Sequence, residues 1–249
     1  MTDPKQRFSD RVADYIKYRP KYPKEVIDIL KSEINFSSGD TVADIGAGTG
    51  FLTELFLDHG NLTYAVEPNE AMRKACSDLY GTDNLLKIVD GSAEVTQLPD
   101  QAIDLIVAGT AFHWFDAIET KKEFMRILKP DGHILLIWNV RKDDAPFTAS
   151  YEEILRRRVP GYAASQHRKF DPELISDFLH PRQMKKQVLA NSQSFDWEGF
   201  KGRALSSSFM PKQGLLHDEV LSEMHDLYHR YEENGQVSFQ YDTIMYYTL

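Results

Sequence analysis

The sequence predicts an α/β fold in which helices cover both faces of a mostly parallel sheet. The first observation is a short apolar run that enters a glycine-rich turn, T-V-A-D-I-G-A-G-T-G-F over residues 41–51, and continues as a helical pattern. The second is the run A-I-D-L-I-V-A-G over residues 102–109, whose continuous apolar character is typical of a strand buried on both faces. The 249 residues are enough for one large α/β domain, or for a domain with a substantial insertion.

The glycine turn at residues 46–50 is the centre of the predicted site. Gly46, Gly48 and Gly50 can adopt backbone angles closed to other residues, and their missing Cβ atoms let a ligand lie against the main chain. The helix that follows offers unpaired N–H groups and the positive end of its dipole. Glycines also mark ordinary strand-to-helix turns, so this turn alone is weak evidence for a site.

A carboxylate strengthens this prediction. The apolar run at residues 62–66 ends at Glu67, and a second parallel strand there would bring the Glu67 carboxylate to the same edge of the sheet. Such a carboxylate can accept hydrogen bonds from both ribose hydroxyls of a nucleoside. Nicotinamide dinucleotides and S-adenosylmethionine both satisfy this arrangement. The spacing favours S-adenosylmethionine, because Phe51 stands where the dinucleotide fingerprint requires a third small residue.

The motif D-x-G-x-G-x-G, formed by Asp44 and the three glycines, resembles the first motif of the class I S-adenosylmethionine-dependent methyltransferases. R-P-K-Y-P at residues 19–23 and T-A-F-H-W-F at residues 110–115 are similar to elements of a small-molecule subgroup that includes trans-aconitate methyltransferase-like proteins. The resemblance is specific from about Tyr15 to Trp138. It implies a doubly wound seven-stranded sheet in the order 3-2-1-4-5-7-6, with strand 7 antiparallel.

The resemblance also implies which residues bind the cofactor. Residues 1–22 are expected to form an arm over it, with Arg19 on the methionine carboxylate, on the substrate or on an acidic surface neighbour. No metal site is expected. The implied cofactor-binding residues are Tyr15, Arg19, Asp44, Gly46, Ala47, Gly48, Glu67, Pro68, Asn69, Met72, Ser92, Ala93, Glu94, Gly109 and Thr110.

Helical spacing and caps define the elements of the first third of the chain. An amphipathic helix over residues 23–34 has a proline suited to its first turn. The helix after the glycine turn should stop at Gly60, and Asn69 should cap a third helix that ends at Gly81. Residues 85–89 then form a strand.

The segment D-G-S-A-E at residues 90–94 is expected to wrap the adenine ring. The resemblance implies that the backbone N–H of Ala93 contacts the ring, whereas the aspartate usual before it is Ser92 here. A hydroxyl still accepts one hydrogen bond, so adenine selectivity would shift to Glu94 or to backbone carbonyls. A simple polar loop is the alternative interpretation.

Two residues after the buried strand are the catalytic candidates. In the resembled subgroup the H-W-F element lies beside the methyl-donor sulfur, which points to His113 and Trp114. Methyl transfer from a sulfonium is an in-line displacement, so the protein mainly aligns the reactants and excludes water. A general base is needed only when the acceptor carries a proton, and a carboxylate acceptor needs none. His113 is therefore a candidate base, a packed wall residue or a hydrogen-bond donor.

The second half of the chain gives weaker signals. Asp116 should cap a helix that runs through Leu128. Beyond it, the patterns predict a strand at 133–138, an exposed strand at 187–197, a helix around 220–231 and a β-rich tail at 237–249.

Residues 141–186 are expected to form a helical insertion, or lid, near the substrate cleft. This segment holds ten Lys or Arg against seven Asp or Glu, so its charge is about +3, against about −12 for the rest of the chain. A basic lid would favour an anionic acceptor such as a carboxylate. The alternative is a solvated helix surface on which Arg156, Arg157 and Arg158 occupy several faces.

Composition narrows the class of protein. The formal net charge of −9 argues against a nucleic-acid partner. The N-terminal residues lack the apolar core of a signal peptide, and no apolar run is long enough to span a membrane. A single cysteine, Cys76, fits a reducing cytoplasm. A nicotinamide-dependent oxidoreductase and a non-catalytic S-adenosylmethionine-binding module remain as alternative functions, and the oligomeric state stays open.

Overall fold

The computed structural model describes residues 16–160, 162, 171–207, 209–211 and 213–249. The chain divides into two compact units. The larger unit comprises Lys21–Trp138, Phe170–Leu189 and Thr243–Leu249, and the smaller unit comprises Met1–Pro20, Asn139–Lys169 and Ala190–Asp242. Each unit has its own hydrophobic core.

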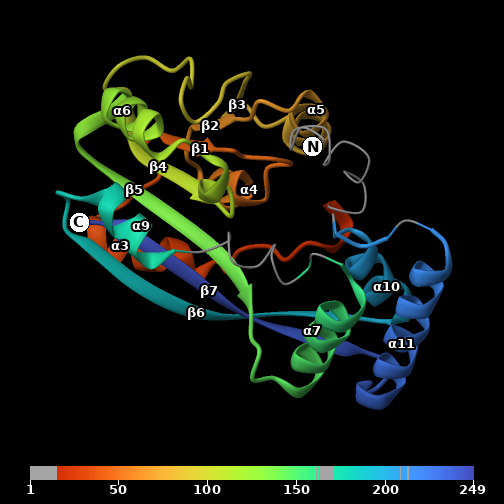
Figure 1. Cartoon of the computed structure of the whole chain (residues 1–249). Coiled ribbons are helices and arrows are strands. Elements are labelled where there is room, and N and C mark those ends of the chain that lie inside the picture. Colours follow the sequence, from red (N-terminus) through yellow and green to blue (C-terminus); the bar gives the residue numbers. More distant parts are fainter. Residues whose placement is uncertain (1–15, 161, 163–170, 208, 212) are drawn as a thin grey trace. The chain divides into compact units, whose positions relative to one another are not determined.

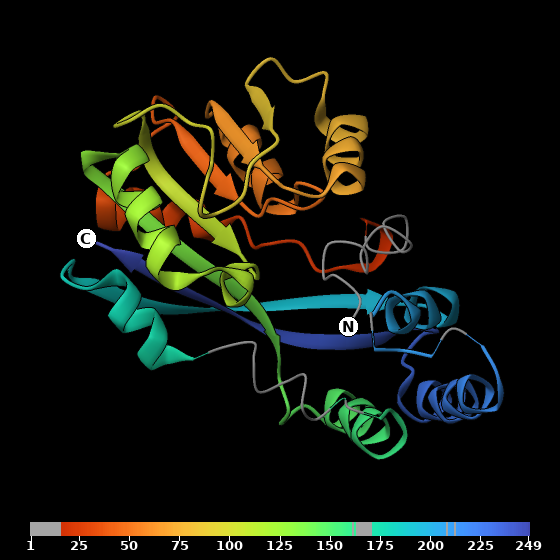
Figure 2. The same cartoon turned by 45° about the horizontal axis from the view of Figure 1, so that its top comes forward.

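Seven strands form one sheet in the order β3-β2-β1-β4-β5-β7-β6 (Figure 1). The first five strands along the chain pair in parallel, and β7 runs antiparallel to its neighbours (Figure 2). The predicted fold class, strand order and reversed seventh strand are therefore confirmed. The strands are β1 Val42–Ile45, β2 Thr63–Val66, β3 Leu86–Val89, β4 Ile103–Gly109, β5 Leu128–Arg141, β6 Met184–Phe195 and β7 Val237–Thr248.

The helix caps of the larger unit follow the sequence prediction. Gly60 ends α4 in a left-handed conformation with a φ of 93°. The Asn69 side chain caps α5 by accepting a hydrogen bond from Met72 N at 3.1 Å, and Asp116 caps α6 by accepting one from Glu119 N at 3.1 Å. The described helices of this unit are α3 Glu25–Ile34, α4 Phe51–His59, α5 Glu70–Tyr80, α6 Ala117–Ile127 and α9 Pro172–Leu179.

Some boundaries differ from those expected. β5 begins at Leu128 rather than at residue 133, because Ile103 pairs with Leu128 before a register shift in the β4–β5 ladder. β6 ends at Phe195, and α10 Trp197–Leu205 begins where the alternating pattern predicts continued strand.

The smaller unit takes part of the predicted insertion. Residues 141–169 belong to it and residues 170–186 belong to the larger unit. Its described helices are α7 Pro146–Arg158, α10 and α11 Leu215–Tyr231, and the last two lie between β6 and β7. The lid role of residues 141–186, the arm at residues 1–22 and the single-domain organisation remain predictions.

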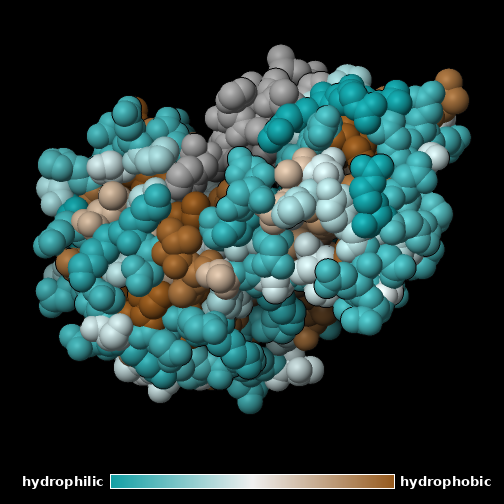
Figure 3. Space-filling model, turned by 90° about the horizontal axis from the view of Figure 1, so that it is seen from below, coloured by the Kyte–Doolittle hydropathy of each residue, from teal (hydrophilic) through white to brown (hydrophobic). Residues whose placement is uncertain are grey.

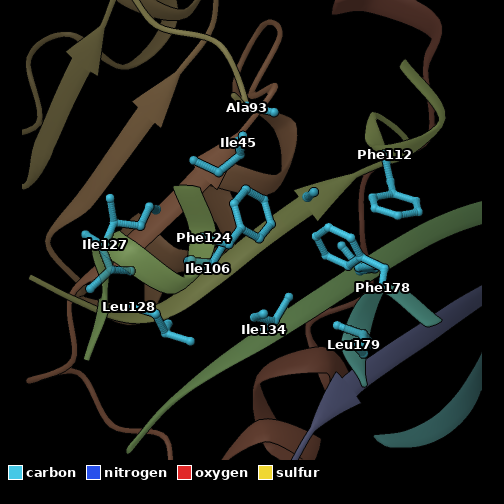
Figure 4. Close-up of a cluster of buried hydrophobic side chains, with 14 of the residues drawn as sticks. Ile45, Ala93, Ile106, Phe112, Phe124, Ile127, Leu128, Ile134, Phe178 and Leu179 are labelled. Atoms are coloured by element: carbon cyan, nitrogen blue, oxygen red, sulfur yellow. The ribbon is translucent and has the colours of Figure 1, made fainter. Parts of the chain in front are cut away.

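Apolar layers cover both faces of the sheet in the larger unit. Successive strand residues point to opposite faces, so Ile106 packs in one layer and Val107 in the other. α6 and α9 contribute Phe124 and Phe178 to the first layer, which also holds Phe112 (Figure 4). α3 and α4 cover the second layer. This two-sided burial explains the continuous apolar run of β4.

The described part of the smaller unit packs around aromatic side chains. Phe239 of β7 lies at its centre, with ring-centroid distances of 4.9 Å to Tyr151, 5.0 Å to Phe147 and 5.8 Å to Phe200. Tyr151 and Phe147 come from α7, and Phe200 comes from α10. Aromatic packing therefore holds both helices against β7.

Hydrophilic side chains cover most of the face shown in Figure 3, and apolar residues gather in a band within it. The net charge of −9 and the mean hydropathy of −0.44 accord with such a surface. In the described part of the chain, no helix combines the length and apolar character that a membrane crossing requires.

The contacts of Phe178 lead to a stability prediction. Its ring centroid lies 4.7 Å from that of Phe112 and 5.6 Å from that of Phe124, and the side chain is buried. Phe178→Ala should lower the free energy of unfolding by about 3–5 kcal/mol, because apolar burial is lost and a cavity remains. Leu174→Ala, on the exposed side of the same helix, is the matched control and should change it by about 0.5 kcal/mol or less. Urea denaturation measures both, and equal effects would contradict the packing of α9.

Candidate functional site

The carboxyl ends of three neighbouring strands meet at one edge of the larger unit. β1 pairs in parallel with β2 on one side and β4 on the other, with Ile45 opposite Val66 and Asp44 opposite Val107. The glycine turn, Glu67 and the segment that begins at Gly109 follow these three strands. The strand order reverses between β1 and β4, and open α/β sheets bind ligands at such an edge.

The glycines of the turn serve different purposes. Gly46 N and Ala47 N donate hydrogen bonds to Val66 O at 2.8 Å and 3.2 Å. A Cβ on Gly46 would lie 2.7 Å from Ala111 Cβ, so Gly46 permits the close approach of the segment after β4. Gly48 has a φ of 59°, and a Cβ there would meet no atom of the described residues within 4 Å. Gly48 therefore leaves main chain open to a ligand.

The Glu67 carboxylate connects this turn to the start of α5. Its Oε2 accepts a hydrogen bond from Gly48 N at 3.0 Å, and its Oε1 accepts one from Asn69 N at 2.8 Å. Both oxygens of this carboxylate are therefore engaged by backbone N–H groups, which fixes its position at the edge of the sheet. Pro68 lies between Glu67 and Asn69 in the sequence, and Met72 N donates a hydrogen bond to the Asn69 side chain that caps α5. The predicted residues after β2 therefore form one short connected segment.

Asp44 is fully buried at the end of β1. Its Oδ2 accepts a hydrogen bond from the Thr53 hydroxyl at 2.7 Å, and its Oδ1 has no partner among the described residues. Burial raises the pKa of Asp44 to about 7, although the Thr53 hydrogen bonds act in the opposite direction. Asp44 thus supports the turn from beneath. Thr53 was not among the predicted site residues, and its place in the first turn of α4 was the available signal.

The predicted adenine segment lies after β3 and is tied to the start of α6. Glu94 Oε1 accepts a hydrogen bond from Asp116 N at 3.0 Å, and Ser92 N donates one to Val95 O at 3.0 Å. Partial burial opposes ionisation of Glu94, but the hydrogen bonds from Asp116 N and the Ser92 hydroxyl lower its pKa. Ala93 is buried in the first apolar layer. The Glu94 carboxylate is therefore already hydrogen-bonded within the protein.

The segment after β4 carries the two catalytic candidates. Gly109 ends the strand, and Thr110, with a φ of 56°, has its hydroxyl 3.2 Å from the Tyr22 hydroxyl. His113 and Trp114 lie in the 3₁₀ turn Phe112–Trp114, with ring centroids 4.8 Å apart. His113 is half-buried and Trp114 is 52% exposed, while Phe112 anchors the turn in the apolar layer (Figure 4). An aromatic surface therefore adjoins the edge.

Two predicted cofactor residues lie outside the described part of the larger unit. Tyr15 lies outside the described residues. Arg19 belongs to the smaller unit, where its carbonyl oxygen accepts a hydrogen bond from Gln193 Nε2 at 3.3 Å. The other predicted residues lie in the larger unit. Tyr22 of the same R-P-K-Y-P element does reach the edge, through Thr110.

Much of the positive charge of residues 141–186 is paired. In the smaller unit, Arg157 and Arg158 form ion pairs with Glu223 of α11, at 2.5 Å each. Arg141 pairs with Glu152 at 2.6 Å. The excess of Lys and Arg in this segment therefore does not form an open cationic surface among these residues.

Known protein sequences are similar to the part of this chain that contains the glycine turn. Residues 43–136 match the family model described as a methyltransferase domain. An uncharacterized methyltransferase-like protein of Schizosaccharomyces pombe is 31% identical over 170 residues, which cover 68% of this chain and 62% of the relative. An uncharacterized methyltransferase of Mycobacterium tuberculosis is 34% identical over 151 residues, which cover 60% of this chain and 59% of the relative. The chain thus spans about three-fifths of the curated relatives it matches.

Solved structures share the fold along nearly the whole chain. A putative type II methyltransferase from Anaeromyxobacter dehalogenans matches with a TM-score of 0.64 and 19% identity, covering 93% of this chain and 97% of that chain. A putative methyltransferase from an antibiotic biosynthesis pathway of Anabaena variabilis matches with a TM-score of 0.65 and 21% identity, covering 94% and 98%. At sequence identities of 19% and 21%, these similarities show a shared fold and no more.

The buried Asp44 leads to a prediction about pH. Its folded pKa of about 7 lies above the ordinary aspartate value near 3.9, so the unfolded chain loses this proton first as the pH rises. Between about pH 4 and pH 7 the Asp44 contribution should therefore reduce stability progressively. Asp44→Asn keeps an acceptor for Thr53 but lacks the titration, so its unfolding free energy should fall less over this range.

Urea denaturation at a series of pH values measures this difference. Asp58→Asn on the exposed face of α4 is the matched control for the change in net charge. Parallel pH profiles for the wild type and Asp44→Asn would contradict the burial argument.

Proposed function

We propose that this protein transfers the methyl group of S-adenosylmethionine to a small-molecule acceptor, because residues 43–136 match the family model of a methyltransferase domain. The observation that carries the proposal is the pair of hydrogen bonds from Gly48 N and Asn69 N to the Glu67 carboxylate. These bonds fix a carboxylate beside the Gly48 main chain, where a Cβ would meet no atom of the described residues within 4 Å.

The residues at this edge fit the cofactor chemically. Glu67 would accept the ribose hydroxyls, the turn at Gly46–Gly48 would lie along the methionine part, and the backbone of Ala93 would meet the adenine ring. When bound, S-adenosylmethionine supplies an electrophilic methyl group. The chain then has to orient the two reactants and keep water away. The neighbouring side chains of His113 and Trp114 would line the space beside the methyl group and help to exclude water from it.

We propose an anionic carboxylate as the first candidate for the acceptor. The charge of about +3 in residues 141–186 supports this choice, although ion pairs such as Arg158–Glu223 reduce the field it produces. A carboxylate carries no proton at neutral pH, so His113 would act as a hydrogen-bond donor or wall rather than as a base. A cytoplasmic location belongs to the same proposal, supported by the single buried cysteine, Cys76.

Two other functions are tested by the same experiments. A nicotinamide oxidoreductase is disfavoured by Phe51, which occupies the position of the third small residue in the dinucleotide fingerprint. Calorimetry should detect binding of S-adenosylhomocysteine and not of NAD, and binding of NAD alone would overturn the proposal. A non-catalytic module would bind S-adenosylhomocysteine yet release no methyl group to any acid of an acceptor panel supplied with methyl-labelled S-adenosylmethionine.

The contacts of Glu67 generate a prediction about affinity. Glu67→Gln replaces one acceptor oxygen by an NH₂ group, which cannot accept from Gly48 N or Asn69 N and leaves fewer acceptor positions for the ribose. S-adenosylhomocysteine should bind roughly ten- to hundredfold more weakly, which corresponds to the loss of about 1.5–3 kcal/mol for charge-assisted hydrogen bonds.

Calorimetry measures this change against a control nearby. Glu70→Gln makes the same charge change on an exposed side chain in the first turn of α5 and should leave the affinity unchanged. Equal affinities for the Glu67→Gln variant and the wild type, with both folded, would mean that Glu67 only supports the turn.

The proposed acceptor generates a prediction for His113. General-base catalysis contributes about 10²–10⁴-fold where it operates, and a carboxylate acceptor needs none. His113→Asn should therefore lower kcat by less than about tenfold with an acid that is a substrate. A collapse of kcat with an unchanged KM would instead assign His113 as a base acting on a protonated acceptor.

A further inference from the structure

The smaller unit contains a buried group of polar side chains that has no part in the edge site described above. Arg141 and Glu152 form an ion pair at 2.6 Å, and Arg141 Nη2 donates a hydrogen bond to the Tyr162 hydroxyl at 2.9 Å. Tyr162 in turn donates to the second oxygen of Glu152. This triad is nearly closed to solvent, and its one positive charge is balanced by its one negative charge.

Arg203 adds a second cation to this group. It lies on α10 and is only 2% exposed. Its contacts within the described residues are a hydrogen bond from Nη1 to the Ser207 hydroxyl at 3.4 Å and the face of the Phe239 ring at 5.9 Å. Among the described residues, its Nε has no hydrogen-bond partner and no carboxylate pairs with it. A buried guanidinium without an anion is unfavourable.

Two tyrosine hydroxyls in the same core also have no partner among the described residues. They belong to Tyr151 of α7 and Tyr241 of β7, which are 0% and 1% exposed. Both side chains lie around the ring of Phe239, as Arg203 does: the ring centroids of Tyr151 and Tyr241 are 4.9 Å and 6.3 Å from that of Phe239. The Tyr151 ring also lies under the Arg141 guanidinium at 5.1 Å. The two hydroxyls and the two guanidinium groups therefore belong to one cluster.

The net charge of this cluster and its unpartnered hydrogen-bond donors indicate which kind of ligand would complete it. The cluster contains two guanidinium groups, of Arg141 and Arg203, and one carboxylate, of Glu152, so its net charge is +1. Buried polar groups in folded proteins have hydrogen-bond partners in all but a few cases, yet here an Arg Nε and two phenol hydroxyls lack them. A carboxylate would supply the negative charge and acceptor oxygens for the guanidinium and the phenols together.

We propose that Arg203, with the hydroxyls of Tyr151 and Tyr241, binds the carboxylate group of a small organic acid in the core of the smaller unit. Arg141 and Glu152 form the preorganised side of this site, because each already satisfies the other. Phe239 supplies an apolar floor beneath the guanidinium of Arg203. The acid belongs to the class put forward above as acceptor, but the inference rests on contacts of the smaller unit alone.

The test uses the full-length protein without S-adenosylmethionine, so that its failure is distinguishable from failure of the methyltransferase proposal. Thermal unfolding is followed in malonate, sulfate and chloride at equal ionic strength. A ligand that binds only the folded state stabilises it by mass action. Saturating malonate should raise the melting temperature of the wild type by roughly 2–4 °C above that in chloride. No difference from chloride, or stabilisation by sulfate alone, would overturn the carboxylate assignment.

Arg203→Met separates a binding role from a structural one. It removes a buried charge that has no anionic partner and keeps similar volume, so the variant should be as stable as the wild type in chloride, and malonate should no longer stabilise it. An undiminished malonate effect in this variant would overturn the proposal. Arg156→Met on the exposed face of α7 is the matched control and should retain the whole effect.

A second variant keeps the test decisive if Arg203→Met does not fold. Tyr241→Phe removes only a hydroxyl that has no partner among the described residues, so it should fold normally. Calorimetric titration with malonate should then give at least a threefold weaker affinity than the wild type. Equal affinities would exclude the Tyr241 hydroxyl from the site and contradict the proposal.

Discussion

The turn after β1 and the start of α5 both depend on one carboxylate, that of Glu67. Gly48 N and Asn69 N donate to its two oxygens, so the side chain holds together two loops from different strands. The parallel pairing of β1 with β2 makes this geometry possible, because it places the ends of both strands at one level. A charged group fixed in this way is preorganised for a ligand and needs little further ordering on binding.

The sheet, the caps and the position of the edge are readable from the sequence because they arise from local patterns. Asn69 caps a helix through a residue three positions away, and the run that forms β4 is apolar throughout. The different purposes of Gly46 and Gly48 are not readable in this way, since they depend on Ala111, which approaches from another strand. The support of Asp44 by Thr53 is missed for a related reason, because the place of Thr53 in the first turn of α4 marks it as a candidate but does not identify its partner.

The smaller unit shows the limit of sequence reasoning most clearly. A row of arginines in α7 suggests a cationic lid, yet in the folded unit Arg157 and Arg158 are neutralised by Glu223 of a helix that lies far along the chain. Arg203, outside the segment that composition singles out, is instead a buried cation with no carboxylate partner among the described residues. Only tertiary packing decides which charges face solvent and which are enclosed, so the net charge of a segment is a poor guide to its binding surfaces.

The central claim is that S-adenosylmethionine binds against the glycine turn and Glu67. Hydrogen–deuterium exchange followed by mass spectrometry measures this directly on the full-length protein. S-adenosylhomocysteine should slow exchange in the peptides that contain Gly46–Gly50 and Glu67–Met72, and NAD at the same concentration should not. Unchanged exchange in both peptides at a saturating concentration of S-adenosylhomocysteine, or equal protection by NAD, would contradict the account.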